Sequence, residues 1–309
     1  MREEAEVVAR EAGRSTMRPA ESGAPVGQAE RVEAGLRLAV SSWSLLPRSP
    51  RELVERVRAA GLDAVQLALD PVRTGAMPLE RLRAELEATG VRVLSGMMAT
   101  AGEDRSTLES LRRTGGLVPD ATWEENFAAA QEDARVAEEL GITLVTFHAG
   151  FIPPEAGDPR RRVLAERVRR IARVFVDRGT RVALETGQET AATLAEVLAE
   201  LGDTGVGVNF DPANMILYGT GDPVRALRRL APWVRQVHIK DAVAAEHPGE
   251  LGREVPVGEG DVNWTAFFAA LRAAELRVDL VIEREAGEQR VADVRRAREL
   301  VERYVVVER

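Results

Sequence analysis

Three carboxylates and one histidine end four consecutive segments of the chain in which bulky apolar and polar residues alternate. They are Glu185 in ALETG, Asp211 in NFDPANM, His238 in VHIKD and Glu283 in VIERE. If these side chains converge in a buried site they need a compensating charge, because burying like charges together is costly. A divalent cation supplies that charge, and an O₃N donor set suits Mn²⁺, Mg²⁺, Co²⁺ or Zn²⁺ without selecting one. The pattern predicts one divalent metal ion bound by these four residues.

Eight predicted strands, each followed by a predicted helix, position these residues. The strands are expected at 36–42, 62–69, 91–98, 142–148, 181–185, 205–211, 234–240 and 278–283, and the helices at 50–60, 78–89, 124–140, 159–177, 190–201, 222–230, 264–274 and 291–304. Alternating strands and helices indicate a parallel sheet, and eight units at this length favour a single (β/α)₈ TIM barrel of the α/β class. Two Rossmann domains are disfavoured because no G-x-G-x-x-G follows the first strand.

The barrel is expected to cover residues 35–309 as one catalytic domain. Residues 1–34 are rich in Pro, Gly, Ser and Ala and lack periodic apolar residues after Arg14. Such a composition buries too little apolar surface to offset the entropy lost on ordering. These residues are therefore predicted to form a short, flexible N-terminal extension.

The alternation within the strands indicates which side chains point into the barrel. In the seventh strand Val237 and Ile239 alternate with His238 and Lys240, and neighbouring residues of a strand face opposite sides of the sheet. The bulky apolar residues are expected to pack against the helices, so the polar residues face the interior. Active sites of such barrels lie at the C-terminal ends of the strands. The four predicted metal ligands should therefore meet at that rim.

Other polar residues near the same strand ends are predicted to bind the substrate. They are Gln66, His148, Asn214, Lys240 and Arg253. Lys240 is the only lysine in the chain, and its compact ammonium is expected to hold a substrate oxygen or to pair with a carboxylate. Arg253 lies in a glycine-containing loop after the seventh strand, where it could bind a phosphate or a carboxylate.

The motifs ALETG, NFDPANM, VHIKD and VIERE, together with FHAG at the end of the fourth strand, resemble the xylose isomerase-like TIM-barrel superfamily. They are most similar to its sugar (phosphate) isomerase/epimerase branch, and the resemblance covers about residues 36–305. It implies that the four predicted ligands bind the metal, with Glu283 favoured over Glu285, and that His148 contacts the substrate. Ketose 3-epimerases of this family have a histidine where this chain has Asn214, which weighs against a 3-epimerase of free ketoses.

The resemblance implies a metal-dependent enzyme of carbohydrate metabolism, a sugar isomerase or epimerase. Such an enzyme transfers a proton α to a carbonyl through a metal-bound enediolate. Glu185 and Glu283 are the predicted catalytic residues, because they would reach the substrate from opposite sides and could remove and return the proton. Manganese is one of the candidate metals.

Several alternatives remain open at this point. A metal-dependent dehydratase of a keto-sugar or ketoinositol would begin with the same proton abstraction and then expel a β-hydroxyl. A Schiff-base aldolase would use Lys240 as its nucleophile. A non-catalytic sugar-binding barrel would keep the metal without proton exchange. A DNA-repair endonuclease of the same superfamily would need a histidine-rich zinc cluster, whereas this chain has three histidines.

Composition limits the partners and the compartment. The net charge of −8 argues against nucleic acid, whose binding proteins are usually basic. No apolar run approaches the roughly 18 residues that a membrane span requires, and the polar N-terminus does not resemble a signal peptide. We expect a cytoplasmic protein that acts on a small carbohydrate, and the sequence is compatible with a homo-oligomer.

Overall fold

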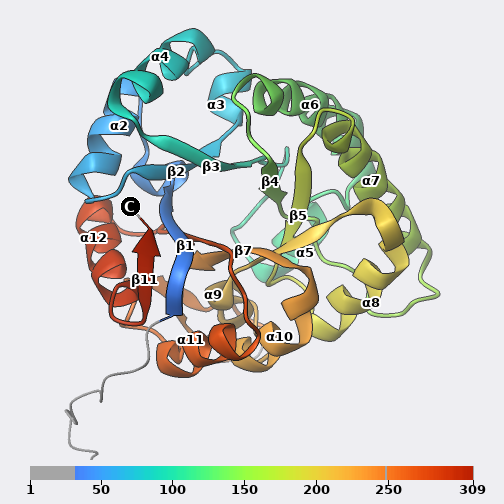
Figure 1. The fold of residues 1–309 in the computed structure, drawn as a ribbon. Coiled ribbons are helices and arrows are strands. Elements are labelled where there is room, and N and C mark those ends of the chain that lie inside the picture. The colour runs from blue at the N-terminus through green and yellow to red at the C-terminus, as the bar shows by residue number, and fades with distance from the viewer. Residues whose placement is uncertain (1–31, 248, 309) are drawn as a thin grey trace, which may run out of the picture. The chain divides into compact units, whose positions relative to one another are not determined.

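The computed structural model describes residues 32–247 and 249–308. Eight parallel strands close into a barrel, because the first of them pairs with both the second and the eighth (Figure 1). The barrel strands are β1 (Val32–Ser41), β2 (Ala64–Ala68), β3 (Arg92–Met97), β4 (Leu144–Phe147), β5 (Arg181–Glu185), β6 (Gly207–Phe210), β7 (Val234–Ile239) and β10 (Asp279–Ile282). The predicted TIM barrel is confirmed. Residues 1–31, which make up most of the predicted N-terminal extension, lie outside the described part of the chain.

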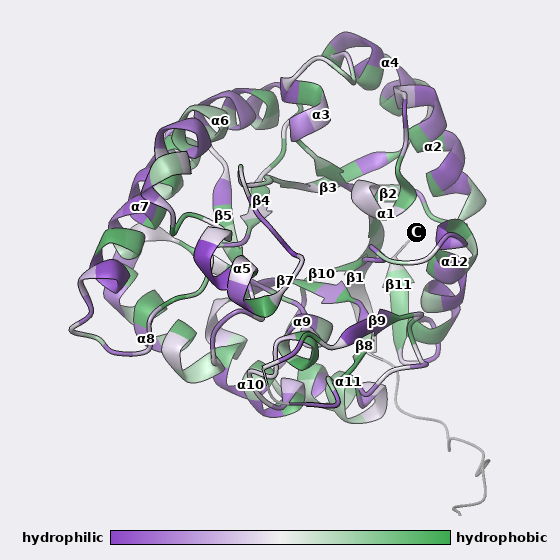
Figure 2. Cartoon of the chain, turned by 180° about the vertical axis from the view of Figure 1, so that it is seen from behind, coloured by the Kyte–Doolittle hydropathy of each residue, from purple (hydrophilic) through white to green (hydrophobic). Residues whose placement is uncertain are grey.

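The helices that connect these strands form a ring around the barrel (Figure 1). They are α2 (Pro50–Ala59), α4 (Leu79–Thr89), α6 (Asp120–Glu139), α7 (Pro159–Val176), α8 (Ala191–Leu201), α10 (Pro223–Leu230), α11 (Trp264–Ala273) and α12 (Arg290–Val301). Local signals set their ends. In α2, the Ser49 hydroxyl accepts a hydrogen bond from the Glu52 amide while Pro50 occupies the first turn, as the sequence predicts. Hydrophilic and hydrophobic residues alternate along these helices, as Figure 2 shows.

The core has two parts, and they follow the alternation of the strands. The outward apolar residues, such as Leu184, Val237 and Ile282, pack with the helices in one large cluster. Inside the barrel lies a small separate cluster of Ala39, Ala64, Leu94 and Val281. Polar side chains share the interior: Ser95 Oγ donates to Gln236 Oε1 at 2.6 Å, and Gln236 Nε2 donates to Asn209 Oδ1 at 3.2 Å. The polar register therefore faces inward, as expected.

Several elements were not predicted from the sequence. A last strand, β11 (Val305–Glu308), pairs in parallel with β1. A short antiparallel hairpin, β8 (Asp241–Val243) with β9 (Arg253–Val255), follows β7. Short helices occupy several connections, namely α1 (Ser42–Leu45), α3 (Asp70–Arg73), α5 (Leu108–Thr114) and α9 (Pro212–Leu217), with single 3₁₀ turns at Gly202–Thr204 and Ala231–Trp233. Within residues 32–247 and 249–308, no helix combines the length and apolar composition needed to cross a membrane.

A buried carboxylate joins α3 to α6 and makes stability depend on pH. Arg73 Nε donates to Asp133 Oδ1 at 3.1 Å, while Asp133 Oδ2 is buried without a hydrogen-bond partner among the described residues. Burial, reinforced by the charge of Asp70, raises the pKa of Asp133 to about 7 from an ordinary value of 3.8. Because the folded state holds this proton more tightly than the unfolded chain, the associated stability is full below pH 4 and is lost as pH rises through 7.

Replacing Asp133 with asparagine should remove this dependence. Between pH 4 and pH 7 the free energy of unfolding of the wild type should fall, relative to that of Asp133→Asn, by up to about 4 kcal/mol. Urea unfolding at several pH values measures the difference, with exposed Asp203→Asn as the control. If the free energies of unfolding of the wild type and Asp133→Asn differ by the same amount at pH 4 and pH 7, Asp133 is not the source of the pH dependence.

Candidate metal centre and substrate pocket

The four predicted ligands come together at the C-terminal end of the barrel. Glu185 is the last residue of β5, Asp211 follows β6, His238 lies in β7 and Glu283 follows β10. The sheet register aligns them, because His238 is opposite Val281 and Glu185 is opposite Asn209. All four side chains are at most 3% exposed. One donor atom from each lies within 4.8 Å of every other, which makes them a candidate metal site.

The potential metal-ligating atoms of the four residues lie close together, but several of them have no hydrogen-bond partner among the described residues. His238 Nδ1 lies 3.3 Å from Glu283 Oε2, 3.4 Å from Glu185 Oε1 and 3.7 Å from Asp211 Oδ2. Nevertheless His238 Nδ1, Asp211 Oδ2 and Glu283 Oε1 are buried and have no hydrogen-bond partner among the described residues. Leaving such atoms unpaired in the interior is costly. Their convergence on one point fits a bound divalent cation, since three oxygens and one imidazole nitrogen are ligands that such ions accept.

Gln66 orients the histidine for this role. Its Oε1 lies 3.0 Å from His238 Nε2, and its Nε2 donates to Thr146 Oγ1 at 3.1 Å, which fixes the orientation of the amide. When Oε1 accepts from Nε2–H, a neutral His238 would direct its Nδ1 lone pair at the cluster, where it could bind a metal; Asn209 Nδ2 also lies 3.0 Å from Nε2. Gln66 is completely buried beside His238. The predicted contact of Gln66 with substrate stays a prediction.

The motif NFDPANM explains how Asp211 and Asn214 are held. Asp211 is the N-cap of α9, and its Oδ1 accepts from the amides of Ala213 and Asn214, which leaves Oδ2 for the cluster. Asn214 Nδ2 donates to Glu185 Oε1 at 2.8 Å. Gly187 permits this approach: at φ +137° it has no side chain, and a Cβ there would lie 2.4 Å from the Cβ of Asn214.

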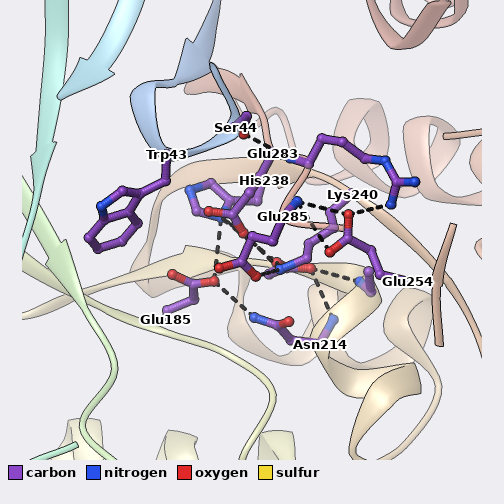
Figure 3. Close-up of polar contacts among 12 residues, drawn as sticks. Trp43, Ser44, Glu185, Asn214, His238, Lys240, Glu254, Glu283 and Glu285 are labelled. Atoms are coloured by element: carbon purple, nitrogen blue, oxygen red, sulfur yellow. Dashed lines mark hydrogen bonds and ion pairs between the residues drawn. The ribbon is translucent and has the colours of Figure 1, made fainter. Parts of the chain in front are cut away.

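Lys240 lies between the cluster and the solvent-facing rim. Its Nζ is 3.0 Å from Glu283 Oε2 and 2.5 Å from Glu285 Oε2 (Figure 3). Glu285 also accepts from Arg105 Nη1 at 3.1 Å, and Arg105 Nε donates to Glu103 at 2.7 Å. Glu285 therefore belongs to this ion-pair chain, whereas Glu283 is the residue that joins the candidate metal cluster.

These contacts set the charge states around the cluster. Burial acts to lower the pKa of Lys240, but the carboxylates of Glu283 and Glu285 outweigh it and hold that pKa well above the ordinary value. Burial also disfavours the charged form of Glu283 and acts to raise its pKa. The positive charges of Lys240 and His238 outweigh burial and hold that pKa well below the ordinary value. A Schiff-base lysine must lose its proton to act as a nucleophile. The raised pKa of Lys240 therefore disfavours the aldolase alternative.

A pocket of about 420 Å³ opens beside the cluster. It is lined by Trp43, Leu46, Met97, Met98, Ala99, Thr100, Glu103, Arg105, His148, Glu285 and Arg290. His148 connects the pocket to the cluster, because its Nε2 lies 3.6 Å from Glu185 Oε1. Glu103 and Arg105 were not found from the sequence, since they lie in a long connection without strand or helix periodicity. Their only sequence signal is that this connection follows a barrel strand.

The hairpin after β7 has a supporting role that the sequence did not indicate. Glu254 in β9 accepts from Arg284 Nη1 at 2.7 Å and from the amide of Glu285 at 2.9 Å, so it fixes the loop after β10 (Figure 3). The neighbouring Arg253 is exposed and lies outside the cluster and the pocket. Its predicted contact with substrate stays a prediction.

Comparison with known proteins agrees with the fold. The family described as "Xylose isomerase-like TIM barrel" matches residues 54–304, and the chain belongs to this family. The structure of a xylose isomerase domain protein from Planctomyces limnophilus is 32% identical, with a TM-score of 0.78 over 87% of this chain and 96% of that one. The uncharacterised Escherichia coli protein YihM is 29% identical over 46% of this chain. This match spans 45% of the length of YihM.

A further solved structure shares the fold alone. It is the 3-keto-D-glucoside 4-epimerase YcjR from E. coli, which is 17% identical, with a TM-score of 0.66 over 86% of this chain and 99% of that one. The protein described here is thus a xylose isomerase-like barrel with a buried Glu-Asp-His-Glu cluster at the C-terminal end of its strands.

Proposed function

We propose that this protein is a divalent-metal-dependent sugar isomerase or epimerase that transfers a proton at a carbon next to a carbonyl. The observation that carries the proposal is the buried cluster of Glu185, Asp211, His238 and Glu283, whose donor atoms lie within 4.8 Å of one another. The adjoining pocket of about 420 Å³ has the size of a small-molecule site, roughly 300–1,000 Å³. The fold is shared with a sugar epimerase, which supports the class of reaction.

The residues of the site have different roles in the proposed reaction. A divalent ion held by the four ligands would neutralise charge that develops on a substrate oxygen. Glu185 and Glu283 are the proton-transfer groups, because they reach the cluster from β5 and β10, on either side of His238. His148, next to Glu185, is placed to hold a substrate hydroxyl. Two bases on opposite sides of one carbon suit epimerisation.

The charges that line the pocket favour an uncharged sugar over a sugar phosphate. Arg105 is paired with Glu103 and Glu285, and Lys240 with Glu283 and Glu285. The guanidinium of Arg290 donates to backbone carbonyls of Trp43, Arg284, Glu285 and Gly287. A phosphate would have to displace carboxylates from Arg105 or Lys240, or backbone carbonyls from Arg290, to gain a cation.

The free sugar should therefore be preferred to its phosphate ester by at least about tenfold in kcat/KM, which corresponds to about 1.4 kcal/mol. Matched pairs of a ketose and its phosphate, assayed with the same metal, measure this ratio. A phosphate ester that is turned over as well as the free sugar would show that an arginine is released to bind it.

The proposed activity can be tested with a panel of ketoses, ketoinositols and keto-glycosides. The purified chain is supplied with Mn²⁺, or treated with a chelator as the control, and the products are identified by nuclear magnetic resonance. An epimer or isomer that forms only with metal supports the proposal, whereas loss of water from the substrate would identify a dehydratase. Turnover that survives the chelator unchanged would contradict a metal-dependent reaction.

A further inference from the structure

A second cavity, of about 780 Å³, lies between α7, α8 and the loops that follow β4, β5 and β6. Its volume is that of a small-molecule site, roughly 300–1,000 Å³. Most of its wall is apolar, formed by Val118, Phe151, Ile152, Pro153, Pro154, Val163, Leu164 and Tyr218. None of the four predicted metal ligands lines it. The cavity is therefore distinct from the metal centre.

The same loops build the cavity and the metal centre. After β4, His148 faces the substrate pocket, and Phe151, three residues later, lines the cavity. After β5, Glu185 joins the metal cluster, and Gln188, again three residues later, lines the cavity. Tyr218 packs edge-on against Phe151 with ring centroids 6.1 Å apart. The loops that line the cavity therefore also carry His148 and Glu185.

Tyr218 also connects the two sites electrostatically. Burial raises the pKa of its hydroxyl, while the positive charges of Lys240 and Arg105 oppose that rise. These two cations belong to the ion-pair chain beside the metal cluster. Tyr218, which lines the cavity, is therefore close enough to these charged groups to be influenced by them.

Gln188 is a polar residue of the cavity whose side-chain amide has no hydrogen-bond partner among the described residues. Its side chain is 4% exposed, and neither Nε2 nor Oε1 has a hydrogen-bond partner among the described residues. A buried amide left unpaired is destabilising. A carboxamide presents a donor and an acceptor side by side, so the partner that satisfies it must offer the complementary pair.

The other polar groups of the cavity favour an uncharged ligand. Burial raises the pKa of Glu189 to about 8, so its carboxyl is largely protonated at neutral pH. Arg167 donates to the carbonyls of Leu117 and Val118 and is paired with Asp120. At the rim, Arg160 is paired with Asp158 and Arg112 stacks over the ring of Phe151. Among these residues, Arg167 and Arg160 are paired with carboxylates, and Arg112 keeps its charge at the exposed rim, away from the apolar interior of the cavity.

We propose that this cavity binds an uncharged, mostly apolar group that presents one hydrogen-bond donor and one acceptor to Gln188. Two sources supply such a group: a substituent carried by the sugar substrate, or a separate small molecule. The first source rests on the proposed function, whereas the second does not.

Direct binding of acetanilide, a flat ring with an amide edge, tests the cavity. Isothermal titration of the full chain should detect binding, and Gln188→Leu should weaken it by about tenfold, because both hydrogen-bonding atoms are lost while the volume is kept. Val163→Trp should fill the cavity from α7 and abolish binding. Val176→Trp is the matched control, because both valines are 47% exposed on the same helix and Val176 does not line the cavity.

Absence of acetanilide binding to the wild type would overturn the proposal. So would equal binding by the wild type, Gln188→Leu and Val163→Trp. Because Val163 is exposed, its variant should fold even if Gln188→Leu does not. This measurement involves no turnover, so a failure of the proposed reaction would leave its result unaffected.

A kinetic comparison then separates the two sources. The sugar identified by the panel is prepared with a 4-acetamidophenyl or a methyl substituent, and kcat/KM is measured for Val163→Trp and Val176→Trp. A loss confined to the aryl compound in Val163→Trp assigns the cavity to a substrate substituent. Equal values for both compounds, together with lost acetanilide binding, assign it to a separate ligand. Both results support the cavity as a site for this chemistry.

Discussion

Replacing Glu185 or Glu283 with glutamine is expected to lower kcat by about 10²–10⁴-fold, the usual contribution of a positioned acid or base. Glutamine keeps the shape of the side chain and an oxygen that can accept from Asn214 at position 185. It removes the ability to take up a proton. The expected loss therefore lies in kcat, measured at saturating substrate and metal.

Glu288→Gln is the matched control for these two variants. It makes the same chemical change in the loop that follows β10, at an exposed position outside the cluster. It should retain full activity. If Glu185→Gln and Glu283→Gln both kept more than about a tenth of wild-type kcat, neither residue would be a proton-transfer group.

Replacing Lys240 with methionine is expected to destabilise the metal-free protein by about 3–5 kcal/mol, the usual result of removing one partner of a buried ion pair. The Lys240 ammonium is 3.0 Å from Glu283 Oε2 and 3.9 Å from Asp211 Oδ2, and all three side chains are buried. Methionine fills a similar volume but leaves the carboxylates uncompensated. Urea unfolding in the presence of a chelator measures the change.

A double substitution separates charge from packing in this prediction. In Lys240→Met with Glu283→Gln, the fully buried carboxylate that pairs with the lysine at 3.0 Å is neutral, so part of the lost stability should return. The free energy of unfolding of the double variant should exceed the value calculated by adding the two single effects. A Lys240→Met variant that loses less than about 1 kcal/mol would show that the pair is worth no more than an exposed one.

Most of the barrel could be predicted because its signals are local. In β5 the predicted and observed bounds coincide, and in α2 the Ser49 cap and Pro50 mark the start of the helix. The strand β11 could not be predicted in the same way. Its three valines follow α12 after a three-residue turn, and its partner is β1, at the other end of the barrel sequence. Long-range pairing of this kind leaves no periodic pattern in the chain.

The candidate site, like the fold, has a part that could be predicted from the sequence and a part that could not. The four predicted ligands lie at strand ends, where alternation and barrel geometry together predict that side chains converge. The contact of Gln66 with His238 joins residues 172 positions apart, so the sequence could identify Gln66 as inward-facing but not name its partner. Arg105 comes from an irregular connection, and only the folded chain shows that it reaches Glu285.

The central claim is that the cluster supports proton transfer at a carbon next to a carbonyl, and solvent exchange tests it most directly. The protein is incubated with Mn²⁺ and each carbonyl sugar of the panel in D₂O, and the substrate carbons are followed by nuclear magnetic resonance. We predict that deuterium enters the carbon α to the carbonyl of one class of sugar, and that Glu185→Gln and Glu283→Gln prevent it. No exchange with any of these sugars, or undiminished exchange in both variants, would contradict the account.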